Sequence, residues 1–417
     1  MISKWAWLWH LLSRRLWFRA SMISLLAVAA AILSLILSPY LPFGLSTSVG
    51  ADAVDHILNI IASSMLAVTI FSLSTMVTTY ATATANVTPR AIRLLIEDST
   101  TQNVLATFVG SFIYSVMGII TLSMGAYGER GRVVLFAMTL IVIALIVVTL
   151  LHWIDYLLRL GRVGETTNAV EEVTMQAMRR RREKPCLGGQ ALADPEKGIP
   201  DGAQPVFPDR VGYVQHLDTA GLAATARERN GAVYVAALPG AFVDTNRPMA
   251  WCSGFDDTEG MEAVRDAFTV ADERSFDQDP RFGVSVLTEI ASRALSPATN
   301  DMGTAIDVIG RQVRVLSIWA DTVNPEEPLY PEIWVPEVKV EDLFDDAFDP
   351  IARDGAAIPE VQMRLHKAFA ALGRIDDPRY AESALRHSAL ALARAEATIG
   401  FEPDRQRIRQ AAALVRA

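Results

Sequence analysis

Charged and polar side chains are spaced most densely in residues 274–301. Carboxylates and arginines at this density could bind a polyanion or a metal ion. Much of the segment also resembles helix ends, because Asp279 precedes Pro280, a pairing typical of a helix N-terminus. Glu289 and Arg293 have the i,i+4 spacing of an ion pair. A structural network is therefore favoured over a ligand site, and the candidate residues are Arg274, Asp277, Asp279, Arg281, Glu289, Arg293, Ser296, Asn300 and Asp301.

A second polar set follows one side of the uncharged stretch from Ile57 to Pro89. At about 100° per residue, these hydroxyl and amide side chains share one helix face. They either line a water-filled path or binding groove, or let neighbouring helices approach and form hydrogen bonds, and the structural interpretation is favoured. Residues 81–86 are too polar for lipid, so we expect them to project into the cytoplasm or a protein-lined cavity. The set consists of Ser64, Thr75, Thr78, Thr79, Thr82 and Asn86.

Other chemistry has little support in the sequence. No Lys, Arg, Asp or Glu lies near the middle of an apolar stretch, which weakens a proton-coupled transporter. Asp155 and Arg159 have the spacing of an interfacial ion pair, one turn after His152. There is no Ser-His-Asp arrangement, Walker loop, HExxH or GxGxxG motif, and the six histidines lack metal-ligand spacing. We predict no catalytic residue and no metal site, and any cofactor is unknown.

These residues must be positioned by two halves of different composition. The 417-residue chain is 51% hydrophobic and 20% charged, with a mean hydropathy of +0.24, whereas soluble chains carry about 25% charged residues. Residues 1–160 contain 9 basic and 6 acidic side chains, and the rest of the chain contains 29 and 41. Because about 20 apolar residues cross a bilayer as a helix, residues 1–160 are predicted to form an all-α membrane domain. Its four spans are 20–38, 57–80, 102–125 and 133–155.

Basic residues near the ends of the spans predict their orientation. Such residues precede the first span, join the second to the third at Arg90 and Arg93, and follow the fourth, and basic flanks stay in the cytoplasm. We therefore expect a multi-pass protein of the bacterial cytoplasmic (inner) membrane with both termini in the cytoplasm. A signal peptide is disfavoured because no small-x-small site closes the first apolar run before Pro39. Residues 5–16 form either an amphipathic interfacial helix or the flank of the first span.

Composition also bears on partners. An acidic pI of 5.3 argues against a nucleic-acid partner. Cys186 and Cys252 are too few for a disulfide framework, which fits a reducing compartment. The expected partners are the lipid bilayer and further copies of the chain, and any small ligand or ion is unknown.

The second half is predicted to be a cytoplasmic α+β domain. Residues 161–209 give a basic helix and a Pro/Gly-rich linker. In the domain at 210–417, strands at 211–217 and 232–238 flank a helix at 219–228, as expected for a small β-rich module of hairpin or half-barrel type. Residues 324–336 contain four prolines and are expected to be a loop. The remainder, from about residue 338 to 415, is predicted to be helical.

The chain resembles the bacterial "domain of unknown function 2254" family of predicted membrane proteins over nearly its whole length. The most specific carriers are residues 276–283 (FDQDPRFG) and 293–301 (RALSPATND). Supporting motifs are Phe71-Ser72-Leu73 running to Thr88-Pro89-Arg90, Thr101-Gln102 with residues 105–108 and Tyr114, residues 212–215, and Pro239-Gly240 with Phe242-Val243. Ser275 and Met302 depart from the expected threonine and proline. The resemblance implies the membrane topology and supplies no activity, substrate or cofactor.

Three functions are consistent with these patterns. The first is a non-enzymatic, channel-like homo-oligomer, in which the long second helix lines or gates a passage that the cytoplasmic domain regulates. The second is a membrane-anchored scaffold or sensor. The third is an inner-leaflet enzyme that uses the residues of the 274–301 motif.

Overall fold

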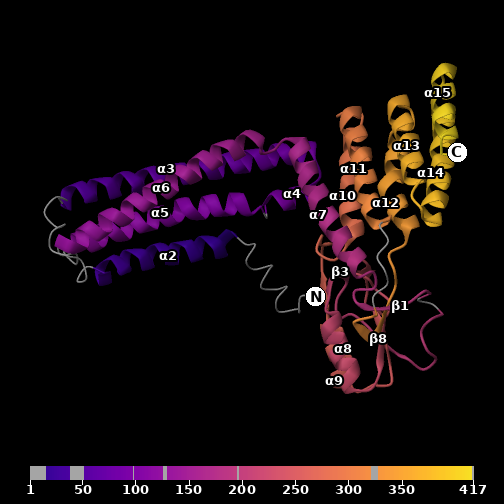
Figure 1. Cartoon of the computed structure of the whole chain (residues 1–417), viewed down its shortest axis with the longest axis horizontal. Coiled ribbons are helices and arrows are strands. Elements are labelled where there is room, and N and C mark those ends of the chain that lie inside the picture. Colours follow the sequence, from indigo (N-terminus) through magenta and orange to yellow (C-terminus); the bar gives the residue numbers. More distant parts are fainter. Residues whose placement is uncertain are drawn as a thin grey trace. The chain divides into compact units, whose positions relative to one another are not determined.

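The computed structural model describes residues 16–37, 51–96, 98–124, 129–194, 197–320 and 327–415. These residues form two compact units, each described by itself below (Figure 1). The N-terminal unit comprises residues 16–85 and 92–165, and the C-terminal unit comprises residues 86–91 and 166–415. The expected amphipathic segment at 5–16 lies almost wholly outside the described residues.

The N-terminal unit is helical. Its elements are α2 (Leu16–Leu37), α3 (Ala51–Asn86), α4 (Pro89–Ile96), α5 (Ser99–Ser123) and α6 (Glu129–Arg159). Three stretches are long and apolar enough to cross a membrane, namely Ala53–Ala81 of α3, Ser99–Ser123 of α5 and Gly131–Arg159 of α6. They match the predicted second, third and fourth spans. The predicted first span coincides with α2, a helix of 22 residues, and its crossing of the membrane stays a prediction.

Helix α5 is the inner helix of this unit. In its most apolar window 56% of the residues are buried, against 22% in α3 and 17% in α6. Tyr114 of α5 is fully packed, and its hydroxyl lies 3.1 Å from Thr139 Oγ1 of α6. By contrast, α3 and α6 expose large apolar side chains such as Phe71 and Val148. Two of the helices therefore present broad apolar surfaces, as lipid-facing helices do.

The C-terminal unit begins with α7 (Val163–Glu183), which includes the predicted basic helix. Its strands are β1 (Gly189–Ala191), β2 (Gln204–Val206), β3 (Gly212–Leu217), β4 (Ala232–Val235), β5 (Phe242–Val243), β6 (Ala250–Ser253), β7 (Phe268–Ala271) and β8 (Tyr330–Val335). They form a mixed five-stranded sheet of order β1-β8-β4-β6-β2 and an antiparallel three-stranded sheet of order β5-β3-β7. Helices α8 (Thr219–Glu228) and α9 (Thr258–Asp266) accompany these sheets.

The predicted strands at 211–217 and 232–238 correspond to β3 and β4, and helix α8 between them has the predicted bounds. The two strands belong to different sheets, because β3 pairs with β5 and β7 whereas β4 pairs with β6 and β8. The β-rich module therefore consists of two sheets, and β3 and β4 do not form a hairpin with each other. The Pro/Gly-rich segment also contributes more than a linker, because β1 and β2 are edge strands and Val206 is buried in the sheet core.

The prediction of a loop at 324–336 is wrong for the part of this segment that the structure describes. Its second part is β8, a strand between β1 and β4 that buries Ile333 and Val335 on alternate positions. Pro331 lies where the pairing register with β1 shifts, and such irregularities are the positions where a strand tolerates proline. Burial of the alternating apolar residues therefore favours a strand here in spite of the prolines.

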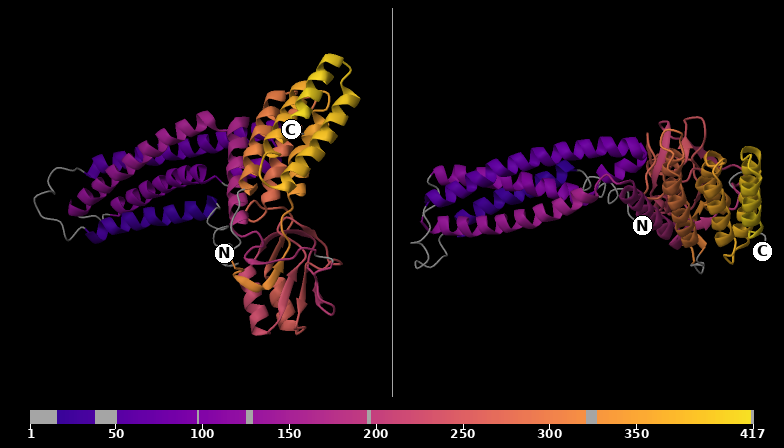
Figure 2. Two further views of the ribbon diagram at one scale, coloured as in Figure 1. Left: turned by 45° about the vertical axis from the view of Figure 1, so that its right-hand side comes forward. Right: turned by 90° about the horizontal axis from the view of Figure 1, so that it is seen from above.

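The rest of the C-terminal unit is helical, as predicted. It consists of α10 (Pro280–Ala294), α11 (Met302–Ala320), α12 (Val340–Asp354), α13 (Pro359–Leu372), α14 (Pro378–Thr398) and α15 (Glu402–Ala413). Figure 2 shows these helices packed side by side, with the strands gathered around α8 and α9 in another part of the same unit. Helix α12 lies against α10, α11, α13 and α14.

Candidate functional site

The 274–301 motif is organised around the carboxylate of Asp279, which is 2% exposed. Asp279 is the N-cap of α10 and accepts a hydrogen bond from Phe282 N at 3.1 Å. Arg274 Nε donates to its other oxygen at 2.8 Å. Burial raises the pKa of the Asp279 carboxyl above its ordinary value, and the Arg274 guanidinium opposes this shift. The two predicted candidates are therefore one buried ion pair that starts a helix.

The Pro239-Gly240 turn packs closely against the Asp279 carboxylate. Gly240 has a φ of +94°, and a Cβ at this position would overlap the Asp279 carboxylate. Gln278 Oε1 accepts from Leu217 N of β3 at 2.9 Å, which ties the same segment to the three-stranded sheet. The motif thus joins the β-rich part of the unit to α10.

Arg281 has its hydrogen-bond partners on another helix, α12. Its Nε donates to Asp346 Oδ2 at 2.7 Å and its Nη1 to Asp342 Oδ2 at 2.7 Å, both on α12. At Gly283, a Cβ would overlap Thr174 Oγ1 of α7, so the PRFG sequence also lets α10 approach α7 closely.

The remaining candidates have separate partners. Glu289 pairs with Arg90 at 2.6 Å. Asp301 caps α11, since it accepts from Thr304 N at 3.0 Å and from Thr304 Oγ1 at 2.6 Å. These bonds lower the pKa of the Asp301 carboxyl. Asn300 precedes it with a left-handed φ of 48°, and Ser296 Oγ donates to Arg293 O at 2.7 Å. The motif therefore distributes its contacts over several neighbours.

Sequence reasoning missed a second ion-pair network between α7 and α11. Glu171, 8% exposed, accepts from Arg314 Nε and from Arg311 Nη1, each at 2.6 Å. Burial alone raises the pKa of Glu171, but the two arginines outweigh it and hold the pKa below its ordinary value. The i,i+3 spacing of the arginines was visible in the sequence, whereas their partner lies about 140 residues earlier.

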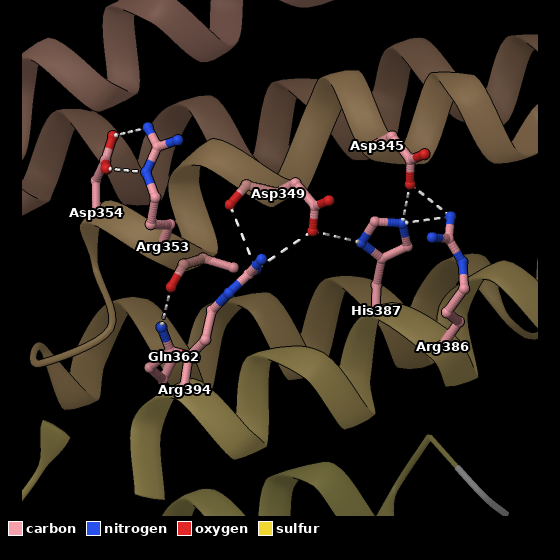
Figure 3. Close-up of polar contacts among 9 residues, drawn as sticks. Asp345, Asp349, Arg353, Asp354, Gln362, Arg386, His387 and Arg394 are labelled. Atoms are coloured by element: carbon pink, nitrogen blue, oxygen red, sulfur yellow. Dashed lines mark hydrogen bonds and ion pairs between the residues drawn. The ribbon is translucent and has the colours of Figure 1, made fainter. Parts of the chain in front are cut away.

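A histidine cluster on α12 and α14 was also missed (Figure 3). His387 is buried, with Nε2 3.0 Å from Asp345 Oδ1 and Nδ1 3.5 Å from Asp349 Oδ1. Arg394 Nη1 lies 3.3 Å from Asp349 Oδ1. Burial lowers the pKa of His387, the aspartates oppose this shift, and Arg386 adds to it.

This cluster is the arrangement of side chains in the described residues that could hold a metal ion. One ligand atom each from Asp345, Asp349 and His387 lies within 4.8 Å of the others, and such nitrogen and oxygen donors suit Zn²⁺. However, Arg386 Nη2 lies 2.5 Å from Asp345 Oδ1 and 3.1 Å from His387 Nε2. A guanidinium already takes the position of the cation, so the cluster as it stands is an ion-pair network.

The residues of the predicted polar face of α3 differ in exposure. Ser64, Thr75 and Thr79 are partly buried and Thr78 is exposed, while the side chains of Thr82 and Asn86 lie outside the described residues. Three hydroxyls donate to carbonyls of their own helix, namely Ser64 to Ile60 at 2.6 Å, Thr75 to Phe71 at 3.0 Å and Thr78 to Ser74 at 3.0 Å. Such bonds let a hydroxyl face lipid or a helix interface.

The outer face of α3 carries a regular pattern that sequence reasoning did not single out. Eight exposed residues recur at alternating spacings of three and four positions, which is the heptad pattern of helices that pack in left-handed pairs. Most of them are small. We call them the α3 seam, which consists of Ile60, Ser63, Ala67, Ile70, Ser74, Val77, Ala81 and Thr84.

Apolar helices of spanning length followed by a mixed α/β unit define a helical membrane protein. The chain belongs to the DUF2254 family of predicted membrane proteins, whose model matches residues 13–371. It is similar to uncharacterized proteins of Mycobacterium bovis (Mb1321c) and Mycobacterium tuberculosis (Rv1290c). Each is 24% identical over 346 residues, which cover 79% of this chain and 66% of the relative. No solved structure matches the chain.

Proposed function

We propose that this protein is a channel-like homo-oligomer of the bacterial inner membrane. In this proposal copies of the chain meet through α3, which lines or gates a passage, and the C-terminal unit regulates it from the cytoplasm. The single observation that carries the proposal is the α3 seam, an exposed heptad-spaced face of the N-terminal unit on which five of the eight residues are Ala, Ser or Thr.

The physical argument starts from what drives helices together in lipid. Apolar side chains gain little by leaving lipid for a protein interface, so association depends on close packing and hydrogen bonds, and small residues allow both. Ala67, Ser74 and Ala81 repeat every seventh residue along one line of the α3 seam. This line offers a second helix a shallow groove of the kind that close helix pairs use.

Polarity favours a passage beside this interface. Helix α3 exposes Asn59, Ser63 and Thr78 within its apolar stretch. The two hydroxyls donate to the backbone of α3 itself, as in the bond from Ser63 Oγ to Asn59 O at 2.8 Å. Asn59 Nδ2 donates to the carbonyl of Asp55 at 2.9 Å and to its carboxylate at 3.1 Å. A hydroxyl or amide oxygen carries two lone pairs, so this face offers more acceptors for water or a permeant ion than the leucine-rich face of α6 does.

The test combines disulfide crosslinking of cysteine variants with measurement of ion flux through liposomes. Ala67→Cys and Ser74→Cys on the seam are expected to form disulfide-linked dimers in native membranes. Leu66→Cys and Leu73→Cys are the matched controls, because they are exposed one position away from the seam. The unmodified chain is the blank, since Cys186 and Cys252 are both free and buried. Liposomes holding the purified protein are expected to pass small ions, and Ser74→Leu should reduce the flux at least severalfold.

Two results would contradict the proposal. One is equal crosslinking at the seam and control positions, which would mean that α3 has no preferred interface. The other is the absence of ion flux over a range of voltages from liposomes in which the seam crosslinks form normally.

A membrane-anchored scaffold or sensor is the second candidate. It is favoured by the way the 274–301 motif joins α10 to the three-stranded sheet, α7 and α12 through partly buried hydrogen bonds and close packing. Crosslinked oligomers without flux would select this candidate. The inner-leaflet enzyme gains no support from this geometry, since Asp279 and Asp301 cap helices and Arg281 pairs with α12.

A further inference from the structure

A cleft opens in the C-terminal unit where four segments distant in the sequence meet. Its volume is about 430 Å³, within the roughly 300–1,000 Å³ range of small-molecule sites. The walls come from the end of α7, the end of α11, the connection between β8 and α12, and the start of α14. The residues that matter below are Arg182, Trp319, Glu337, Asp376, Asp377 and Arg379.

Two of the charged lining residues neutralise each other. Arg379 binds Asp377 through Nη2 at 2.8 Å and through Nε at 3.1 Å, an ion pair that also caps α14. Arg182 Nη1 donates to Ile318 O of α11 at 3.1 Å. Arg379 is thus paired with a carboxylate, whereas Arg182 is held by a neutral carbonyl and contributes its positive charge to the lining.

The other two carboxylates of the lining have no close cationic partner among the described residues. Glu337 and Asp376 are exposed, and neither forms a hydrogen bond or ion pair with any residue that the structure describes. With three carboxylates and two guanidiniums, the lining carries a net charge of −1. An anion is therefore disfavoured in the cleft, and a single positive charge would balance it.

The other walls suit a cation that is organic rather than metallic. Trp319 lines the cleft in the last turn of α11, and an indole face attracts ammonium groups through its quadrupole. Buried Val338 adds an apolar surface that would contact methyl or methylene groups.

We propose that this cleft binds a small organic cation with one ammonium group. The ammonium lies against Trp319 and is balanced by Glu337 and Asp376, and its alkyl part contacts Val338. The proposal is independent of the channel-like function, because it concerns only residues of the C-terminal unit.

The experiment uses the full chain purified in a maltoside detergent and isothermal titration calorimetry. The probes are choline, tetramethylammonium and ethanolamine, and 3,3-dimethyl-1-butanol serves as the uncharged isostere of choline. At least one cation is expected to bind saturably at one site per chain, and for choline the isostere is expected to bind at least tenfold more weakly. Glu337→Gln, Asp376→Asn and Trp319→Leu should each weaken cation binding about fivefold or more.

Asp201→Asn is the control, because Asp201 is exposed and lies outside the cleft. Its affinity should equal that of the unmodified chain. Since Glu337 and Asp376 are exposed, their variants test the charge even if Trp319→Leu impairs folding. Dihexanoylphosphatidylcholine separates the sources of the ammonium: tighter binding than choline identifies a lipid headgroup, and weaker binding identifies a free amine.

The proposal is overturned if none of the three cations binds saturably. It is equally overturned if the uncharged isostere binds as well as choline, or if the Glu337 and Asp376 variants retain full affinity.

Discussion

At the scale of single residues, the Asp279 carboxylate is a buried charge with several roles in the C-terminal unit. It caps α10, pairs with Arg274 and touches the Gly240 turn while almost fully buried. Removing one partner of a buried pair leaves the other charge uncompensated, at a cost of about 3–5 kcal/mol. Asp279→Ala is therefore expected to lower the apparent melting temperature of the detergent-solubilised protein by roughly 10 °C.

An exposed pair provides the comparison. Asp272 binds Arg210 at 2.6 Å, but its side chain is 87% exposed, so Asp272→Ala should cost well under about 1 kcal/mol. Nearly equal melting temperatures for the two variants would mean that the Asp279 network contributes no more than a surface ion pair.

At the scale of elements, the prediction to test is that α2 crosses the membrane. Its 22 residues match the predicted first span, and a fourth crossing would put both termini on the same side of the membrane. Alkaline phosphatase, which is active only in the periplasm, and green fluorescent protein, which fluoresces in the cytoplasm, can report the side at each position. Fluorescent fusions are expected at residue 97 and the C-terminus, and active phosphatase fusions at residues 45 and 127.

The side of the N-terminus decides the number of spans, because residues 45 and 127 lie on the same side whenever α3 and α5 both cross. If a membrane-impermeant reagent labels Ser3→Cys in intact cells while the fusion at residue 97 is cytoplasmic, α2 does not cross the membrane and the three helices α3, α5 and α6 do. An active phosphatase fusion at the C-terminus would instead reverse the orientation that the basic flanking residues predict.

At the scale of the whole molecule, buried histidines couple stability to pH. His366 is fully buried, with Nδ1 3.0 Å from Ser388 Oγ, and burial lowers its pKa to about 4. In the unfolded chain the pKa is about 6.5, so between these values the unfolded state binds more protons. Stability is therefore complete above about pH 6.5 and falls by about 3 kcal/mol as the pH drops to about 4.

His387 shifts in the same direction, which adds to the acid sensitivity. His366→Gln removes the first titration, so its melting temperature should fall less steeply from pH 6.5 to pH 4. Parallel pH profiles for the variant and the unmodified chain would show that His366 titrates alike in the folded and unfolded states.

Much of the organisation was predictable because it depends on local pattern. Apolar runs without charge predicted the stretches now seen in α3, α5 and α6. Local capping chemistry placed the start of α10 at Asp279-Pro280. Strand β8 was missed because its prolines are a local signal for a loop, whereas its pairing with β1 and β4 is set by residues about 100 or more positions away.

The amino-acid sequence by itself determined which segments are long and apolar enough to cross a membrane, which form helices and where a helix such as α10 begins, since solvent preference and capping act within a few residues. Only the tertiary structure decided which charges meet: Glu171 with Arg311, Arg281 with α12, and His387 between two aspartates. It also brought Trp319, Glu337 and Asp376 to one cleft. Electrostatic and packing contacts act through space between residues far apart in the chain, so their partners appear only once the chain has folded.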